Sequence, residues 1–173
     1  MNTVDSLRYA LDRILAAIVM ILVLALSFIV ILGFTTRLMG MPLSWTDELA
    51  GIGLAWLTFY GSALAAGRGA HIASPSVLAI IPLKWRLVVT VLSEICTIAF
   101  FVLLGWMGMY VVEILAGSNL VSLPAISQQL TQSAVPVGAA LFILAEILRL
   151  PELLKTTAAG DSSAESDAED DIF

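Results

Sequence analysis

The chain has 173 residues, of which 60% are hydrophobic and only 13% are charged. A soluble globular domain has about 45–50% apolar and about 25% charged residues, so water is not the solvent for most of this chain. The net charge of −6 comes from acidic residues that cluster in the last thirteen positions. The rest of the chain is neutral, which argues against nucleic acid as a partner.

Four apolar segments are long enough to cross a membrane. The hydrocarbon core of a bilayer is about 30 Å thick, so a spanning helix needs about 20 apolar residues. The segments lie at approximately 14–34, 49–67, 87–112 and 130–150, and they lack the alternation of barrel strands. We therefore expect an all-α membrane protein with four transmembrane helices over residues 1–155. The acidic segment 156–173 should form a disordered tail.

The first and last segments raise two separate questions. The first, Ile14 to Phe34, follows basic residues as a secretory signal peptide does. It is longer than the apolar region of such a peptide and ends without a cleavage site, so we expect it to remain as a helix. The last segment is the weakest and has Pro136 near its start. A proline is tolerated there because the first turn of a helix has unpaired N–H groups.

Basic residues predict the orientation. Lys and Arg accumulate on the cytoplasmic side of membrane helices. Only Arg37 lies on the side that holds the first and third connections. The opposite side holds seven basic residues: Arg8, Arg13, Arg68, Lys84, Arg86, Arg149 and Lys155. Both termini are therefore predicted to be cytoplasmic.

A polar cluster precedes the second segment. Thr46 or Asp47 is suited to cap the helix, Asp47 and Glu48 favour its positive end, and Trp45 suits the membrane interface. A polar contact with another protein would explain the same cluster.

Small residues recur every three or four positions in the second segment. They would let another helix backbone approach closely, whether from this chain or from another. The residues of this stripe are Gly51, Ala55, Thr58, Ser62, Ala65 and Gly69.

Glu94 is the residue that is most costly to place in a bilayer, because it lies about seven residues inside the third segment. Three interpretations stay open. The carboxylate could belong to an ion or proton pathway, or it could contact a partner protein. In the third, the helix begins as early as Lys84 and tilts, so that Glu94 reaches headgroups or Arg86.

The remaining polar residues give no catalytic or metal site. Arg68 and His71 lie where the second segment leaves the membrane, and Arg68 suits a membrane-surface anchor. A lone His71 and a lone Cys96 cannot form a paired metal site or an internal disulfide. Glu113 and the pair Glu146 and Arg149 are interpreted as interface anchors. We find no nucleophile with a base and no phosphate-binding glycine loop, so we predict no enzyme, no cofactor and no metal.

Several short motifs, in this order, resemble the DctQ-like small membrane subunit of tripartite ATP-independent periplasmic (TRAP) transporters. They are Trp45-Thr46-Asp47-Glu48-Leu49, Trp56-Leu57-Thr58-Phe59-Tyr60-Gly61-Ser62-Ala63, Arg68-Gly69-Ala70-His71-Ile72, Ile81-Pro82 and Ser133-Ala134-Val135-Pro136-Val137-Gly138. The resemblance extends from about Ile14 to Leu150. The family often has an arginine soon after Glu-Leu, where this chain has Ala50 and Gly51, so the resemblance implies no arginine-dependent contact there.

The resemblance implies a scaffold subunit of a secondary transporter in the bacterial inner membrane. Such a system imports organic acids by symport with an ion, usually sodium, and without ATP. The implied partners are a large permease subunit, which holds the substrate and ion sites, and a periplasmic substrate-binding protein. Trp45, Asp47, Glu48, Arg68, His71 and Glu94 are then candidates for the partner interface or the membrane surface. The alternative hypothesis is a self-sufficient, homo-oligomeric small transporter or channel that uses Glu94.

Overall fold

The computed structural model describes residues 3–68 and 83–151. Its long helices are α1 (Thr3–Leu38), α2 (Ser44–Gly67) and α4 (Leu83–Ile114). The short helix α5 (Gln128–Gln132) continues, after a break at Ser133, into a C-terminal helix over residues 134–151. Four helical stretches are long and apolar enough to span a membrane, which confirms the predicted all-α membrane fold.

The helices extend beyond the apolar segments that predicted them. α1 begins at Thr3 and α4 at Leu83, several residues before the uncharged runs begin. A helix satisfies its own backbone hydrogen bonds, so it continues through the polar headgroup region. Glu94 therefore stands about three turns into α4, at 3.6 residues per turn.

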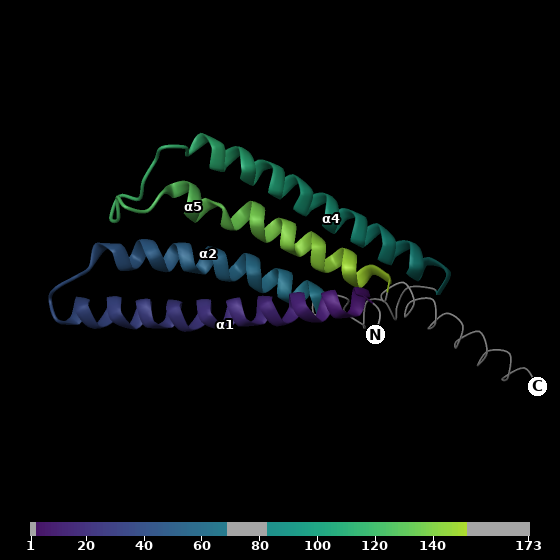
Figure 1. Cartoon of the computed structure of the whole chain (residues 1–173), viewed down its shortest axis with the longest axis horizontal. Coiled ribbons are helices and arrows are strands. Elements are labelled where there is room, and N and C mark those ends of the chain that lie inside the picture. Colours follow the sequence, from purple (N-terminus) through teal and green to yellow (C-terminus); the bar gives the residue numbers. More distant parts are fainter. Residues whose placement is uncertain (1–2, 69–82, 152–173) are drawn as a thin grey trace, which may run out of the picture.

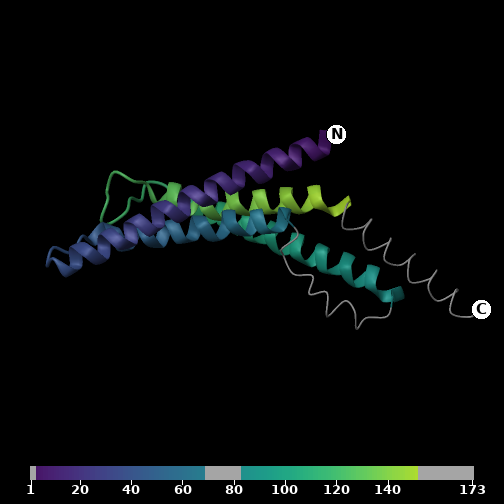
Figure 2. The ribbon, with the colours of Figure 1, turned by 90° about the horizontal axis from the view of Figure 1, so that it is seen from below.

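The four long helices form two hairpins that lie side by side (Figure 1). α1 pairs with α2, and α4 pairs with the C-terminal helix, which lies between α4 and α2. We call the end that holds Thr3, Gly67 and Leu83 the termini end, and the opposite end the loop end. At the termini end α1 and α4 splay away from the inner helices in opposite directions (Figure 2).

The closest packing joins α2 to the C-terminal helix, which we call the inner helix pair. A β-carbon built on Gly138 would overlap the β-carbon of Phe59, and one on Gly67 would lie 3.7 Å from Ala145. Tyr60, Ala63 and Ala66 of α2 are buried, as are Ala139, Phe142 and Ala145 of the facing helix. Small residues therefore allow these two backbones to approach.

α4 packs on this inner pair through a narrow strip. The rings of Phe101 and Phe142 stack with centroids 3.6 Å apart and an angle of 8° between their planes. A β-carbon on Gly105 would lie 3.4 Å from Ala139, and one on Gly108 would lie 2.9 Å from Val135. The two glycines thus hold α4 close to the C-terminal helix along one face.

The outer helices expose most of their apolar surface. Each span was compared through its most apolar 18-residue window. The buried share of that window is 39% in Gln128–Pro151, 6% in α1 and 0% in α4. The exposed side chains of α1 and α4 are large, and they include Phe28, Phe34, Trp106 and Tyr110. Such surfaces require lipid or another membrane protein as their solvent.

The start of α2 differs from the prediction. The helix begins at Ser44, and its N-cap, Leu43, has no side-chain hydrogen bond. The Thr46 hydroxyl donates to the Leu43 carbonyl oxygen at 2.7 Å, so Thr46 does not cap the N–H groups. The expected cap at Thr46 or Asp47 was wrong because the helix begins three or four residues earlier than a cap there requires.

The predicted stripe of small residues on α2 is not the face that packs within this chain. Gly51 and Thr58 are exposed, and a β-carbon on Gly51 would meet nothing within 4 Å. The chain packs instead through a different face, which holds Tyr60 and Ala63. Gly69, the last member of the stripe, lies outside the described residues.

Candidate functional site

Glu48 links α2 to the α4–α5 connection at the loop end of the bundle. Its carboxylate accepts hydrogen bonds from the backbone N–H of Val121 at 3.3 Å and of Ser122 at 3.0 Å. Both donors belong to the long connection between α4 and α5, more than seventy residues away in sequence. Hydrogen bonds to an ionised acceptor are stronger than neutral ones. Glu48 therefore joins the second hairpin to the start of α2.

The connection that Glu48 holds is an ordered element. Asn119 and Ser127 form an antiparallel bridge, and the Leu120 N–H donates to the Ile126 carbonyl at 3.0 Å. Leu120 is buried, while the neighbouring Val121 is 88% exposed. The loop thus presents an apolar tip on a fixed base.

Asp47 points to a different partner from Glu48. Its carboxylate pairs with Arg37, the basic residue in the last turn of α1, at 2.6 Å. Both side chains are more than half exposed, so this ion pair lies at the surface. Trp45 is half-buried beside them. The two acids of the polar cluster therefore have different partners. Glu48 binds the α4–α5 connection, and Asp47 forms an exposed ion pair with Arg37.

Two further polar contacts lie near the loop end, one between the two hairpins and one within the second hairpin. The Trp56 indole N–H donates to the Thr131 carbonyl oxygen at 3.2 Å, and the Gln129 amide donates to the Val112 carbonyl oxygen at 3.1 Å. Neither contact was predicted from the sequence. Both acceptors are backbone carbonyl oxygens, which leave no signal in the sequence.

Arg68 and Asp12 join α2 to α1 at the termini end. Arg68 donates to the two carboxylate oxygens of Asp12 at 2.7 and 3.1 Å. This hydrogen bond, together with the attraction of the charge of Asp12, raises the pKa of the Arg68 guanidinium. Arg8 donates to the Gly67 carbonyl oxygen at 3.3 Å. His71, predicted to lie near Arg68, is outside the described residues.

The carboxylates within the helices are not gathered into one site. Glu94 is half-buried on α4. Glu146 is buried on the C-terminal helix, where Arg149 donates to it at 3.2 Å and is itself largely buried. The expectation that this pair anchors at the membrane interface is therefore wrong, because both side chains pack inward. Within residues 3–68 and 83–151, no three His, Cys, Asp or Glu side chains are placed to hold a metal ion.

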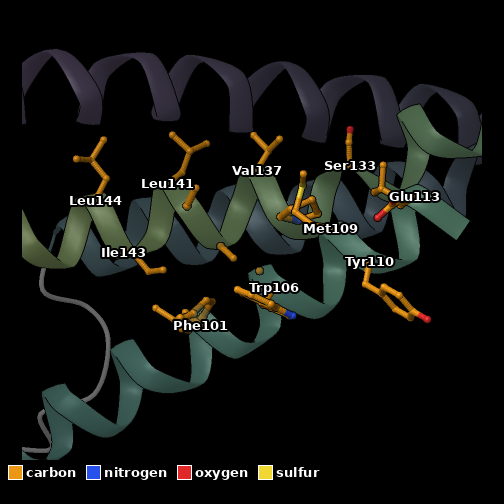
Figure 3. A pocket seen from close by; sticks show the side chains of 16 residues that line it. Phe101, Trp106, Met109, Tyr110, Glu113, Ser133, Val137, Leu141, Ile143 and Leu144 are labelled. Carbon is orange, nitrogen blue, oxygen red and sulfur yellow. The ribbon is translucent and has the colours of Figure 1, made fainter. Parts of the chain in front are cut away.

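An apolar groove of about 1130 Å³ lies between α4 and the C-terminal helix. Figure 3 shows side chains from both helices around it. Glu113 and Ser133 lie at its loop-end limit, and the remaining lining is almost entirely hydrophobic. The lining of α4 includes Trp106, which is 72% exposed, and Tyr110, which is 59% exposed. Large aromatic side chains of this kind are enriched where proteins bind one another.

The chain was compared with models of known protein families. The model for the DctQ component of the tripartite ATP-independent periplasmic transporters matches residues 26–156, well over half of the chain. The chain belongs to this family. A search of curated proteins gave no significant match.

Membership of the DctQ family makes this chain a component of a TRAP transporter, and it confirms the resemblance found in the sequence. The matched region includes Glu48, Trp56 and Arg68, together with the whole apolar groove. It begins after Arg8 and Asp12, so the contacts at the start of α1 lie outside it.

Proposed function

We propose that this chain is the small scaffold subunit of a TRAP transporter that imports organic acids, such as dicarboxylates, by symport with sodium ions. It lies in the bacterial inner membrane with both termini in the cytoplasm. A large permease subunit carries the substrate and ion sites, and a periplasmic protein delivers the substrate. The match to the DctQ family carries this proposal.

The absence of a built transport path among the described residues supports a scaffold role. Transport sites in membrane proteins use helices broken at mid-membrane or clusters of inward-facing charges. α1, α2 and α4 are continuous helices, and the break at Ser133 lies at the loop end. Glu94 and Glu146 lie on different helices and belong to no group that could hold a metal ion.

The groove face of α4 is the surface that we assign to the large permease. α1 has the most hydrophobic window in the chain, and its exposed side chains are mainly aliphatic, as expected for lipid contact. α4 instead exposes Trp106, Met109 and Tyr110 beside a concave apolar surface. Aromatic and Met side chains next to a groove favour a packed protein helix over fluid lipid.

Glu48 serves the proposed function by holding the α4–α5 connection in place. In the proposed orientation this connection faces the periplasm, on the side from which a substrate-binding protein approaches. Its exposed tip, Val121, is fixed by the two hydrogen bonds to Glu48. Asp47 and Arg37 lie at the same end and form part of the same surface.

The experiment is to purify the tagged chain from its native host in mild detergent and to identify the proteins that accompany it. We expect one larger membrane protein at close to equimolar amount. Replacing Trp106 and Tyr110 together by Ala should lower its yield about tenfold or more, as the loss of two central aromatic anchors would. Recovery of the chain alone, as a defined homo-oligomer, would contradict the proposal and favour the alternative that uses Glu94.

A matched control uses the opposite outer helix. Phe28 and Phe34 of α1 are 67% and 64% exposed, similar to the two aromatics of α4. Their double replacement by Ala should leave the yield of the large partner unchanged. An equal loss from both double variants would mean that general damage to the bundle, rather than one interface, governs the co-purification.

A further inference from the structure

A second hollow lies between α1 and α2 at the termini end, and the transport role makes no use of it. Its volume is about 390 Å³, and it is lined by Arg8, Tyr9, Asp12, Gly67 and Arg68. In contrast to the apolar groove, its lining side chains are polar or charged. Its lining residues come from the termini end of α1 and α2, the end at which α1 diverges from the inner helices (Figure 2).

Guanidinium groups stand on both sides of this hollow. Arg68, on the α2 side, is held by Asp12 through its Nε and Nη2 atoms and keeps other N–H donors, since a guanidinium has five. Arg8, on the α1 side, reaches across to the Gly67 carbonyl oxygen at 3.3 Å. The two side chains are thus positioned in advance around one space.

A third guanidinium lies one turn further along α1. Arg13 donates to the Tyr9 hydroxyl at 3.2 Å, and its guanidinium carbon lies 5.9 Å from the centre of the Tyr9 ring. Among the charged side chains that line the hollow, Arg8, Asp12 and Arg68, positive charge exceeds negative charge by one. The hollow therefore favours an anion, and the planar guanidinium matches a phosphate in particular.

The depth of the hollow in the membrane limits what that anion is. The uncharged run from Ile14 to Phe34 is about 30 Å long at 1.5 Å per residue, which equals the thickness of the hydrocarbon core. Asp12 and Arg8 precede this run by less than two turns of helix, which places them at the level of the lipid headgroups. Ile14, at the start of that run, is 59% exposed, so apolar surface begins within one turn of Asp12 along the helix.

We propose that this hollow binds the phosphate headgroup of an anionic phospholipid, such as phosphatidylglycerol, and thereby fixes the start of α1 against α2. Basic pockets between transmembrane helices bind such headgroups by charge and hydrogen bonding. Asp12 has two effects in this site. It orients Arg68, and it also reduces the positive charge that the lipid meets.

The test measures lipid retained by the full-length chain. The chain is reconstituted in phosphatidylcholine vesicles with about 10 mol% phosphatidylglycerol, extracted in mild detergent, washed, and analysed by native mass spectrometry. The wild type should retain phosphatidylglycerol in preference to phosphatidylcholine. Arg8→Gln should lower that preference about fivefold, because one arginine near a membrane surface contributes about that factor.

Two variants separate binding from damage to the fold. Asp12→Asn removes the negative charge but keeps a carbonyl oxygen that can accept from Arg68, so it should raise the preference for phosphatidylglycerol, whereas a purely structural role would make it fall, as with Arg8→Gln. Arg37→Gln removes an arginine of another exposed ion pair, at the loop end, and should change nothing. The proposal is overturned if the wild type shows no preference, if both Arg8→Gln and Asp12→Asn lower it, or if Arg37→Gln lowers it as much as Arg8→Gln.

The same assay distinguishes a lipid from free phosphate. Inorganic phosphate at about 10 mM, added with constant ionic strength, should leave the retained phosphatidylglycerol unchanged, because a lipid is also held by its acyl chains. Displacement by inorganic phosphate would assign the hollow to a soluble anion and overturn the lipid proposal.

Discussion

The inner helix pair and the outer helix α4 differ in the size and the exposure of their side chains. Where α2 meets the C-terminal helix, glycine and alanine bring the backbones together, and Gly138 has no room for a β-carbon beside Phe59. The outer face of α4 has large aromatic and Met side chains that residues 3–68 and 83–151 leave exposed. Lipid is as apolar as a hydrocarbon side chain, so close packing rather than hydrophobicity distinguishes the two regions. The inner pair holds the chain together, and the outer face of α4 is the surface that we propose for a partner.

The largest expected effect comes from filling the inner contact. Gly138→Leu should destabilise the purified chain by about 1–3 kcal/mol or more, because the β-carbon of Phe59 is close to its backbone and cannot move aside. Unfolding in mixed detergent micelles, followed by circular dichroism, measures this. Gly51→Leu is the matched control, since nothing lies within 4 Å of a β-carbon there, and it should be nearly neutral in the isolated chain. Equal destabilisation by both substitutions would contradict the difference in packing between Gly138 and Gly51.

A smaller effect is expected from the polar contact between α2 and α5. Trp56→Phe keeps an aromatic ring to stack on Tyr60, whose ring centre lies 5.4 Å away, but it removes the N–H that donates to Thr131. The loss should be about 0.5–1.5 kcal/mol, the usual net value of one hydrogen bond. The same unfolding measurement applies. A neutral result would show that this hydrogen bond contributes nothing to joining the two hairpins.

The anchor at Glu48 should act locally. Glu48→Ala frees the backbone N–H groups of Val121 and Ser122, so their amide hydrogen exchange should accelerate several-fold while exchange within α2 stays unchanged. Exchange measured by mass spectrometry on peptides covering the α4–α5 connection tests this. Unchanged exchange in that connection would mean that the bridge between Asn119 and Ser127 holds it without Glu48.

The smallest effect is expected at Asp47. Its partner Arg37 and Asp47 itself are 61% and 72% exposed, and pairs of this kind contribute little in water. Asp47→Asn should change the amide exchange rates in the α4–α5 connection by less than about twofold. The equilibrium constant for unfolding should change by no more than that. A larger change, measured in the same two assays, would show that the two neighbouring acids do not have separate roles.

The four spans could be predicted from the sequence because length and hydropathy alone determine them. The family could be recognised because Trp45-Thr46-Asp47-Glu48-Leu49 and the later motifs keep their order. The partners of the polar residues could not be predicted. Glu48 bonds to a connection more than seventy residues away, and Asp12 pairs with Arg68 across 56 positions. Such pairings depend on how the hairpins pack.

The stripe of small residues on α2 shows the limit of periodicity. Gly51 and Thr58 recur at helical spacing, yet the face that packs within the chain holds Tyr60, Ala63 and Ala66. Adjacent helical faces differ by one residue, and both are apolar in a membrane helix. Only the neighbouring helix, through Gly138 and Ala145, decides which face is used.

The most direct test of the scaffold account is site-specific photo-crosslinking in the native host. A photoreactive residue would replace Trp106 on α4, or Phe28 on α1 as the reference position; both side chains are exposed. We predict that position 106 crosslinks to one larger membrane protein and that position 28 does not. Crosslinks to that protein from position 28 but not from position 106, or crosslinks only between copies of this chain, would contradict the assignment of the groove face to the large permease.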